Sequence, residues 1–263
     1  MKKITGIITS LNEAHNIEAC IRSLQLICNE IIVVDSLSSD ATVSIAEKMG
    51  AKVVLQPYLG DGIQKNIALQ YASNDWVFSL DADERITAEL AAEINALDLS
   101  GKSNYDSYAV KRKNMIGSRW VKCCRWYPDY LVRLYRPDKT RFLEVKQHAS
   151  VPAVRMKKLS SAILHYRYKN IGELFAKPER NYSSRGAKIL YLKGKKTNAM
   201  TPVIHGMAAF FVNYFFRGGL FGGIDGLTLS LAIAHNSYMK YAKLLEYQRD
   251  AQVLADENFD KVW

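Results

Sequence analysis

The sequence predicts an α/β protein in which a mostly parallel sheet is flanked by helices and followed by a C-terminal helical extension. Strand-like and helix-like runs alternate through the first hundred residues, as expected for parallel strands joined by crossover helices. The run 31–34 is continuously apolar, which is typical of a strand buried on both faces. With 263 residues, 48% of them hydrophobic, the chain is long enough to bury a sizeable core.

Four strands and four helices are expected in the first hundred residues. The predicted strands cover 4–9, 31–34, 52–55 and 76–80, and the predicted helices cover 16–25, 41–49, 64–71 and 87–97. Asp40 is expected to cap the second helix, and Gly50 is expected to follow its last turn.

Short β-rich runs replace the alternation after residue 100. Runs at 105–110, 130–135 and 163–168 are expected to extend the sheet, and a helical stretch follows over 171–192. Residues 197–216 carry no formal charge and include five aromatic residues, but proline, glycine and asparagine interrupt them, so we expect no membrane span here. A second apolar helix is expected over 226–241.

The net charge of +10 is unevenly distributed. Residues 1–100 carry 7 Lys and Arg against 14 Asp and Glu, whereas residues 101–200 carry 24 against 6. Such a basic segment indicates an anionic partner, whether phosphates, a membrane surface or nucleic acid; a solvated lysine-rich face is the alternative.

The four cysteines, at positions 20, 28, 123 and 124, form no CxxC pair and no zinc-binding set. They are typical of reduced thiols in a cytosolic protein. The first residues do not have the pattern of a signal peptide, so we expect a cytoplasmic protein.

Polar residues follow three of the predicted strands. They lie at 9–13, at 35–40 and at 81–84. Ligands of open α/β sheets bind beyond the carboxyl ends of the strands, so these segments are expected to meet at one site. Asp81 and Asp83 flank a single alanine, and two such carboxylates can hold a hard divalent cation that also contacts a diphosphate.

Several nucleotide-binding and hydrolase motifs are absent from the sequence. It contains no GxxxxGK[ST] loop, no GxGxxG after the first strand and no GxSxG elbow. These absences argue against a kinase, an ATPase, a dinucleotide oxidoreductase and an α/β hydrolase. Nucleotide binding through carboxylates and a metal ion, without a glycine-rich loop, is what transfer from a sugar nucleotide requires.

The runs 8–13, 30–36 and 79–84 resemble the family-2 glycosyltransferases, which have the Rossmann-like GT-A fold. The segments 60–66, 126–130 and 133–136 are similar to those of bacterial enzymes that add a hexose, typically β-glucose, to the inner core of lipopolysaccharide or lipooligosaccharide. The resemblance implies an inverting transferase that uses UDP-hexose, typically UDP-glucose, and Mg²⁺ or Mn²⁺.

The resemblance also implies roles for individual residues. Leu11, Asn12 and Glu13 would line the nucleotide pocket, and Asp35 would accept a hydrogen bond from the uracil N3–H. The other implied contacts are Gln64 and Lys65 with the ribose and diphosphate, Arg133 with the substrate, Asp81 with the ribose or metal, Asp83 with the metal, and His165 with the metal or diphosphate.

An inverting transferase needs a base that takes the proton from the acceptor hydroxyl. Where the relatives commonly have a His-Glu pair, this chain has His148 followed by Ala149. Glu144, Asp129 and His148 are therefore the candidates, and Glu144 is favoured.

The chain is expected to divide by role into three parts. Residues 1–100 would bind the sugar nucleotide, 101–196 would bind the acceptor, and 197–263 would form aromatic helices that lie at a membrane interface or join copies of the chain into a homo-oligomer. We expect a peripheral protein on the inner face of the cytoplasmic membrane.

Two other functions compete with this interpretation. The first hundred residues also permit transfer of a sugar to a polyprenyl phosphate. The basic segment 101–200 permits nucleic-acid binding, but the chain has no RNP, helix-turn-helix or zinc signature, so we expect no nucleic-acid partner.

Overall fold

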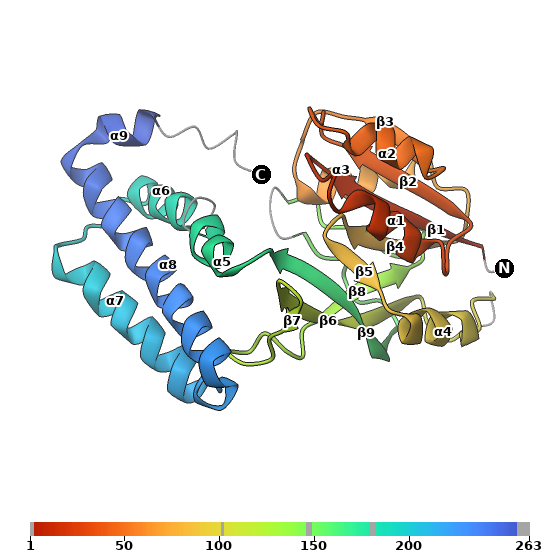
Figure 1. Ribbon diagram of the computed structural model, residues 1–263. Coiled ribbons are helices and arrows are strands. Elements are labelled where there is room, and N and C mark those ends of the chain that lie inside the picture. Colours follow the sequence, from red (N-terminus) through yellow and green to blue (C-terminus); the bar gives the residue numbers. More distant parts are fainter. Residues whose placement is uncertain (1–2, 101–102, 146–148, 179–181, 257–263) are drawn as a thin grey trace. The chain divides into compact units, whose positions relative to one another are not determined.

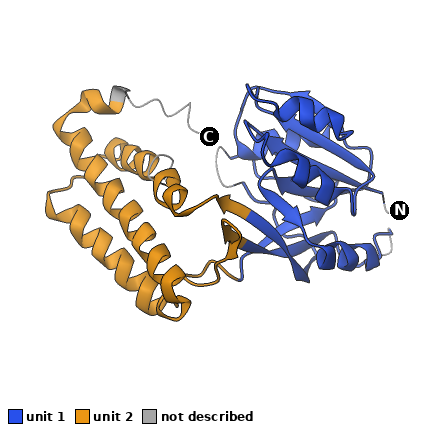
Figure 2. Ribbon diagram, in the orientation of Figure 1, with its two compact units in different colours: residues 1–113, 128–165 blue, residues 114–127, 166–263 orange. Residues whose placement is uncertain are grey.

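The computed structural model describes residues 3–100, 103–145, 149–178 and 182–256. The chain packs as two compact units (Figure 2). Unit 1 comprises Met1–Lys113 and Pro128–His165, and unit 2 comprises Asn114–Tyr127 and Tyr166–Trp263. These packing boundaries differ from the predicted division by role into 1–100, 101–196 and 197–263, which stays a prediction.

A single mixed sheet runs through the fold in the order β3-β2-β1-β4-β8-β6-β9-β5, with β7 paired to β6 (Figure 1). Its strands are β1 (Ile4–Ser10), β2 (Glu30–Asp35), β3 (Lys52–Leu55), β4 (Trp76–Asp81), β5 (Glu84–Ile86), β6 (Ser107–Ile116), β7 (Arg119–Trp120), β8 (Tyr130–Tyr135) and β9 (Met156–Tyr168). The first four pair in parallel, as predicted. The pairs β4–β8, β6–β8 and β5–β9 are antiparallel, so the later strands extend the sheet in the other orientation.

Helices cover both faces of the parallel strands in unit 1. The helices are α1 (Ile17–Leu24), α2 (Thr42–Lys48), α3 (Asp61–Leu69) and α4 (Ala88–Ala96). Alternate strand residues point to opposite faces. Ile8 and Phe78 therefore pack in one core with α1, α2 and α4, whereas Ile7 and Val77 pack in the other with α3.

Unit 2 is mainly helical. Its elements are α5 (Ile171–Pro178), α6 (Ser184–Leu192), α7 (Met200–Phe211), a π-helical turn (Val212–Phe216), a 3₁₀ turn (Leu220–Gly222), α8 (Gly223–Arg249) and α9 (Ala251–Asp256). Helix α8 contacts α5, α6 and α7. The segment 114–127 belongs to this unit because Val121 and Cys124 are buried in one cluster with Leu174 of α5 and Leu229 of α8.

Most predicted elements are confirmed, and three differences lie within the first hundred residues. The helix expected over 64–71 begins at Asp61, directly after Gly60, whose φ of 128° is not helical. Ala41, not Asp40, holds the cap position of α2, although the Asp40 carboxylate accepts a hydrogen bond from the Thr42 N–H. The three-residue strand β5 was not predicted.

The uncharged run 197–216 forms α7 and the π-helical turn. Within the part of the chain that the structure describes, no helix combines the length and the hydrophobicity that crossing a bilayer requires.

Candidate functional site

The carboxyl ends of β1, β2 and β4 lie next to one another. In the strand register Ser10 pairs with Asp35, and Thr9 pairs with Asp81. The polar segments after these strands therefore meet at one edge of the sheet, and this edge is the candidate site.

Asp35 is completely buried at the end of β2. Its Oδ1 accepts a hydrogen bond from the Ser38 N–H at 2.6 Å, and its Oδ2 accepts from the hydroxyls of Ser38 and Ser10 at 2.6 and 2.7 Å. The carboxylate thus fixes the loop that follows β2. Its predicted contact with a uracil base stays a prediction, and that contact requires the loop to expose the carboxylate.

The loop after β1 is joined to the loop after β2. Asn12 has a φ of 55°, in the left-handed region, and its side-chain oxygen accepts a hydrogen bond from the Ser39 N–H at 2.9 Å. Asparagine tolerates this conformation better than most residues. Glu13 donates its N–H to the Thr42 hydroxyl at 2.8 Å. Leu11 is half-buried beside them.

The first turn of α3 approaches the segment around Leu143 closely. A Cβ added to Gly62 would lie 1.8 Å from the Leu143 carbonyl oxygen, so only glycine fits at this position. The Gly62 N–H donates to the Val145 carbonyl at 3.2 Å, and the Asp61 carboxylate accepts from the Ala149 N–H at 2.8 Å. These contacts hold Val145, next to Glu144, and Ala149 against the first turn of α3.

Gln64 and Lys65 follow in α3, and both are buried. The Gln64 amide donates to the Ser36 hydroxyl and to the Gln56 carbonyl, while its Oε1 is buried without a hydrogen-bond partner among the described residues. Lys65 Nζ lies 2.9 Å from a carboxylate oxygen of Asp61 and 2.9 Å from one of Asp81.

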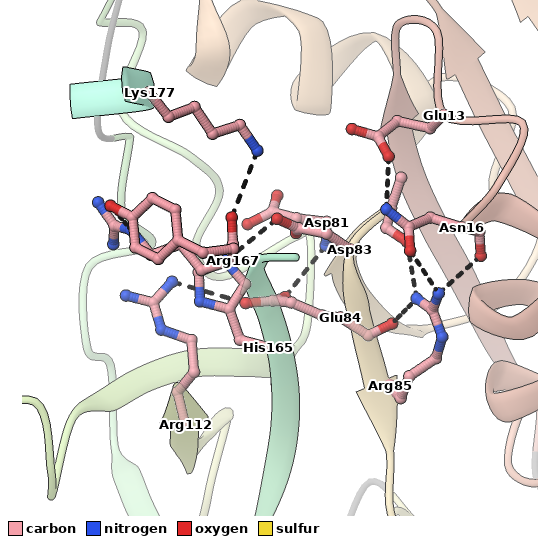
Figure 3. Close-up of polar contacts among 12 residues, drawn as sticks. Glu13, Asn16, Asp81, Asp83, Glu84, Arg85, Arg112, His165, Arg167 and Lys177 are labelled. Carbon is pink, nitrogen blue, oxygen red and sulfur yellow. Dashed lines mark hydrogen bonds and ion pairs between the residues drawn. The ribbon is translucent and has the colours of Figure 1, made fainter. Parts of the chain in front are cut away.

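Asp81 joins Lys65 to a second buried cation, Arg133 of β8. The Arg133 guanidinium lies 3.2 Å from Asp81 Oδ2 and 2.6 Å from Glu84 Oε1. Glu84 is completely buried and also lies 3.6 Å from Arg112 Nη1. Arg112 in turn donates two hydrogen bonds to one carboxylate oxygen of Asp129. We call this chain of alternating charges, from Asp61 to Asp129, the ion network; Figure 3 shows its Asp81, Glu84 and Arg112.

The charges of the ion network stabilise one another. Burial alone would raise the pKa of Asp81, but Lys65 and Arg133 together lower it well below its ordinary value. Burial would lower the pKa of Lys65, but Asp81 and Asp61 raise it above its ordinary value. Burial raises the pKa of Glu84, and Arg133 opposes that rise. At neutral pH Asp81 and Lys65 are therefore both charged.

Asp83 lies beside His165 of β9. Asp83 Oδ2 and His165 Nε2 are 3.2 Å apart, and His165 is paired with Glu84 in the β5–β9 register (Figure 3). The described residues contain no group of three or more His, Cys, Asp or Glu side chains arranged for a metal ion. Mg²⁺ is, however, commonly held by one or two carboxylates with the substrate's phosphates completing its shell, so the carboxylate of Asp83 is a ligand of the type that suits such an ion. The two oxygens of Asp81 already lie beside Lys65 and Arg133.

The three candidate bases lie in different surroundings. Asp129 is engaged by Arg112, as described above. Glu144 is exposed on the segment that Asp61 and Gly62 anchor to α3. His148 lies outside the described residues.

Three members of the ion network were not assigned roles from the sequence: Asp61, Glu84 and Arg112. Asp61 precedes Lys65 by four residues, which is the spacing of a helical ion pair and could have identified it. Glu84 contacts Arg133, and Arg112 contacts Asp129, because strands distant in the sequence pair in the sheet. The sequence carried no signal for that pairing.

The chain is similar in sequence to known glycosyltransferases. The family described as "Glycosyl transferase family 2" matches residues 5–150. An uncharacterized glycosyltransferase of Rickettsia bellii is 36% identical over 93% of this chain and 87% of its own length. The lipopolysaccharide core biosynthesis glycosyltransferase LpsC of Rhizobium meliloti is 28% identical over 94% of this chain and 93% of its own. Among solved structures, glucosyl-3-phosphoglycerate synthase of Mycobacterium tuberculosis, in complex with Mn²⁺ and UDP, is 27% identical over 43% of this chain and 44% of that chain, with a TM-score of 0.35.

The ion network predicts a pH-dependent stability defect for Arg133→Met. Removing the guanidinium leaves the buried Glu84 poorly compensated, so the free energy of unfolding should fall by about 3–5 kcal/mol at pH 7. Without Arg133, the pKa of Glu84 in the folded state rises further above its value in the unfolded chain. A raised carboxyl pKa destabilises the fold only at a pH where the same carboxyl is ionised in the unfolded chain, so the destabilisation grows as the pH rises. The defect should therefore be smaller at pH 5 than at pH 7 in urea unfolding.

Arg136→Met is the matched control, because Arg136 pairs with the exposed Asp138. Its loss should be below about 1 kcal/mol at both pH values. An Arg133→Met defect that is no larger than this, or that does not depend on pH, would contradict the assigned role of the network.

Proposed function

The chain belongs to glycosyltransferase family 2, and we propose that it transfers a hexose, with inversion, from a UDP-sugar to the inner core of lipopolysaccharide or lipooligosaccharide. The ion network at the carboxyl ends of the strands is the observation that carries the proposal. It holds two buried cations beside the edge where open α/β sheets bind nucleotides.

On the donor side, Lys65 and Arg133 supply positive charge for the diphosphate. Arg133 Nε is a buried donor without a hydrogen-bond partner among the described residues. Gln64 Oε1 is a buried acceptor that likewise has no hydrogen-bond partner among them. A phosphate oxygen and a ribose hydroxyl are groups that would satisfy them. Leu11, Asn12, Glu13 and Asp35 would complete the nucleotide pocket.

Mg²⁺ or Mn²⁺ is proposed as the cofactor. Asp83 would hold the ion, with Asp81 and His165 as further candidate ligands. When bound, the ion would neutralise the charge that develops on the departing UDP. Lys65 and Arg133 act in the same sense, since both remain protonated beside Asp81.

Glu144 is the proposed base. Its segment is anchored through Asp61 and Gly62 to the helix turn that also carries Lys65. An exposed carboxylate there is free to accept the proton of an acceptor hydroxyl. Asp129 is a weaker candidate because Arg112 already donates two hydrogen bonds to one of its oxygens.

The acceptor class is inferred from the resemblance of the sequence and from the relative LpsC, which is named for lipopolysaccharide core biosynthesis. Such an acceptor is anchored in a membrane. We therefore propose that the protein is peripheral on the inner face of the cytoplasmic membrane, and the exposed apolar side chains of α7 are consistent with this location.

The proposed function predicts a product of defined mass. Purified protein with Mg²⁺ or Mn²⁺ should add one hexose to a truncated lipooligosaccharide when UDP-glucose is the donor, measured by mass spectrometry across a panel of UDP-sugars. Transfer to polyprenyl phosphate alone would contradict the acceptor assignment. Binding of oligonucleotides without UDP binding would contradict the donor assignment.

Asp83→Ala tests the metal site. Turnover should fall by at least about 100-fold, because charge stabilisation of the leaving group is lost. Mn²⁺ binding in the presence of UDP, followed by electron paramagnetic resonance, should weaken in parallel. Asp138→Ala, which removes an exposed carboxylate of the same unit, is the control. Full activity of Asp83→Ala, or of the unchanged protein in EDTA, would contradict the metal assignment.

Glu144→Gln tests the base. Its kcat should fall by about 10²–10⁴-fold while UDP binding by calorimetry stays unchanged, since a general base acts only in the transfer step. Asp129→Asn is the matched carboxylate-to-amide control and should lose less than about tenfold. A larger loss of kcat in Asp129→Asn than in Glu144→Gln would assign the base to Asp129. Small losses in both variants would leave His148 as the candidate base.

A further inference from the structure

Unit 2 contains a cavity of about 490 Å³, formed where the segment 119–127 meets the turns between α7 and α8. We call it the cationic cavity. Three cations and three aromatic side chains line it: Lys122, Arg125, Arg217, Trp120, Tyr127 and Phe221. None of these six residues has a role in the ion network of unit 1.

The cationic cavity has an excess of positive charge. Asp225 is the one carboxylate among its lining residues, and Arg119, outside the lining, lies 3.0 Å from Asp225 Oδ1. Two of the three cations contact neutral groups: Lys122 Nζ lies 4.1 Å from the Trp120 ring centroid, and Arg217 lies 3.4 Å from the Asn213 side-chain oxygen. Such a cavity attracts an anion, and phosphate suits arginine and lysine donors.

The backbone that presents Arg125 is held in a fixed, unfavourable conformation. Cys124 and Arg125 have φ values of 54° and 60°, which side-chain-bearing residues rarely adopt. The buried Cys124 Sγ contacts the Ser230 hydroxyl at 3.4 Å and the Asn213 carbonyl at 3.7 Å. On the facing turn, a Cβ on Gly222 would lie 2.7 Å from Cys123 Sγ, so the two segments are in close contact. The cavity is therefore preorganised, which reduces the entropic cost of binding.

The rim of the cationic cavity is apolar and exposed. Phe221 lines the cavity yet is 88% exposed, and its neighbours Phe216 and Ile224 are 81% and 69% exposed. Phe216 ends the uncharged run 197–216. Large aromatic side chains beside lysine and arginine are typical of helices that lie at the boundary between lipid headgroups and acyl chains.

We propose that the cationic cavity binds the phosphate of an anionic lipid headgroup at a bilayer surface, with Phe216 and Phe221 inserted among the acyl chains. The combination favours a lipid over a free phosphate, because one residue, Phe221, belongs both to the charged cavity and to the apolar rim. The proposal deepens the proposed function, on which it rests for the presence of a membrane-anchored acceptor. It assigns the membrane contact to unit 2 and leaves the donor site to unit 1.

Vesicle sedimentation of the full-length protein tests the proposal. The protein should partition onto phosphatidylcholine vesicles that contain phosphatidylglycerol and much less onto phosphatidylcholine alone. Arg125→Gln/Arg217→Gln should weaken that partition about 30-fold, since each cation near an anionic surface contributes several-fold. Lys193→Gln/Lys196→Gln removes the same charge from exposed positions of the same unit and should change it less than about threefold.

Phe216→Ser tests the apolar rim, with Leu192→Ser, at a residue that is 70% exposed, as its control. Only Phe216→Ser should weaken partition, by about tenfold or more. The same weakening by both cation pairs would indicate general charge attraction and overturn the cavity assignment. Calorimetric binding of inorganic phosphate that abolishes vesicle partition would identify a free-phosphate site instead.

Two further outcomes separate this proposal from its alternatives. In one, the protein does not bind vesicles and instead sediments as an oligomer that Phe216→Ser converts to a monomer. That result would identify the rim as an interface between copies of the chain and would overturn the proposal. UDP binding is measured on the same variants and should be unchanged. Vesicle binding without UDP binding would count against the proposed transferase function alone, and UDP binding without vesicle binding would count against the lipid site alone.

Discussion

The position of Asp81 between two buried cations is the constraint on which the candidate site depends. Its carboxylate contacts Lys65 of α3 on one side and Arg133 of β8 on the other. Each buried ion loses several kcal/mol of hydration free energy, which is recovered only when its partners are correctly placed. The network therefore links α3, β4, β5 and β8 to one another through paired charges.

Such a network adds little net stability, since well-packed apolar side chains often replace buried ion pairs without loss. The charges are better explained by what they do at the strand ends. Lys65 and Arg133 stay protonated, and Asp81 stays ionised. A site with fixed charges requires little reorganisation when a charged diphosphate binds or departs. The free energy lost when these charges are buried therefore goes into holding the site in a fixed arrangement before the substrate binds.

The local features of this arrangement could be predicted from the sequence, and the distant pairings could not. Apolar runs identify β1, β2 and β4, and the aspartates at the end of β4 and just beyond it identify the edge that carries the site. By contrast, β5 is only three residues long and exists through its pairing with β9, about eighty residues away. The start of α3 was missed because Gly60-Asp61-Gly62 has the composition of a turn, whereas the close approach of Leu143 requires glycine at position 62 within a helix.

The basic segment 101–200 shows why charge counted along a sequence is an incomplete guide to partners. Several of its arginines neutralise acids within unit 1: Arg133 pairs with Asp81 and Glu84, and Arg155 pairs with Asp106. Their charge is therefore used by the fold. Lys122 and Arg125 belong to the same segment but line a cavity of unit 2 whose one carboxylate pairs with Arg119. Only cations without an internal carboxylate partner contribute fully to the attraction of an external anion. The opposite charges of an internal ion pair largely cancel each other at a distance, and salt screens what remains. In unit 2 a ligand is therefore expected where positive charge is left over after the internal pairs are removed. At the strand ends of unit 1 the cations are already paired, and their proposed contribution is preorganisation of the site.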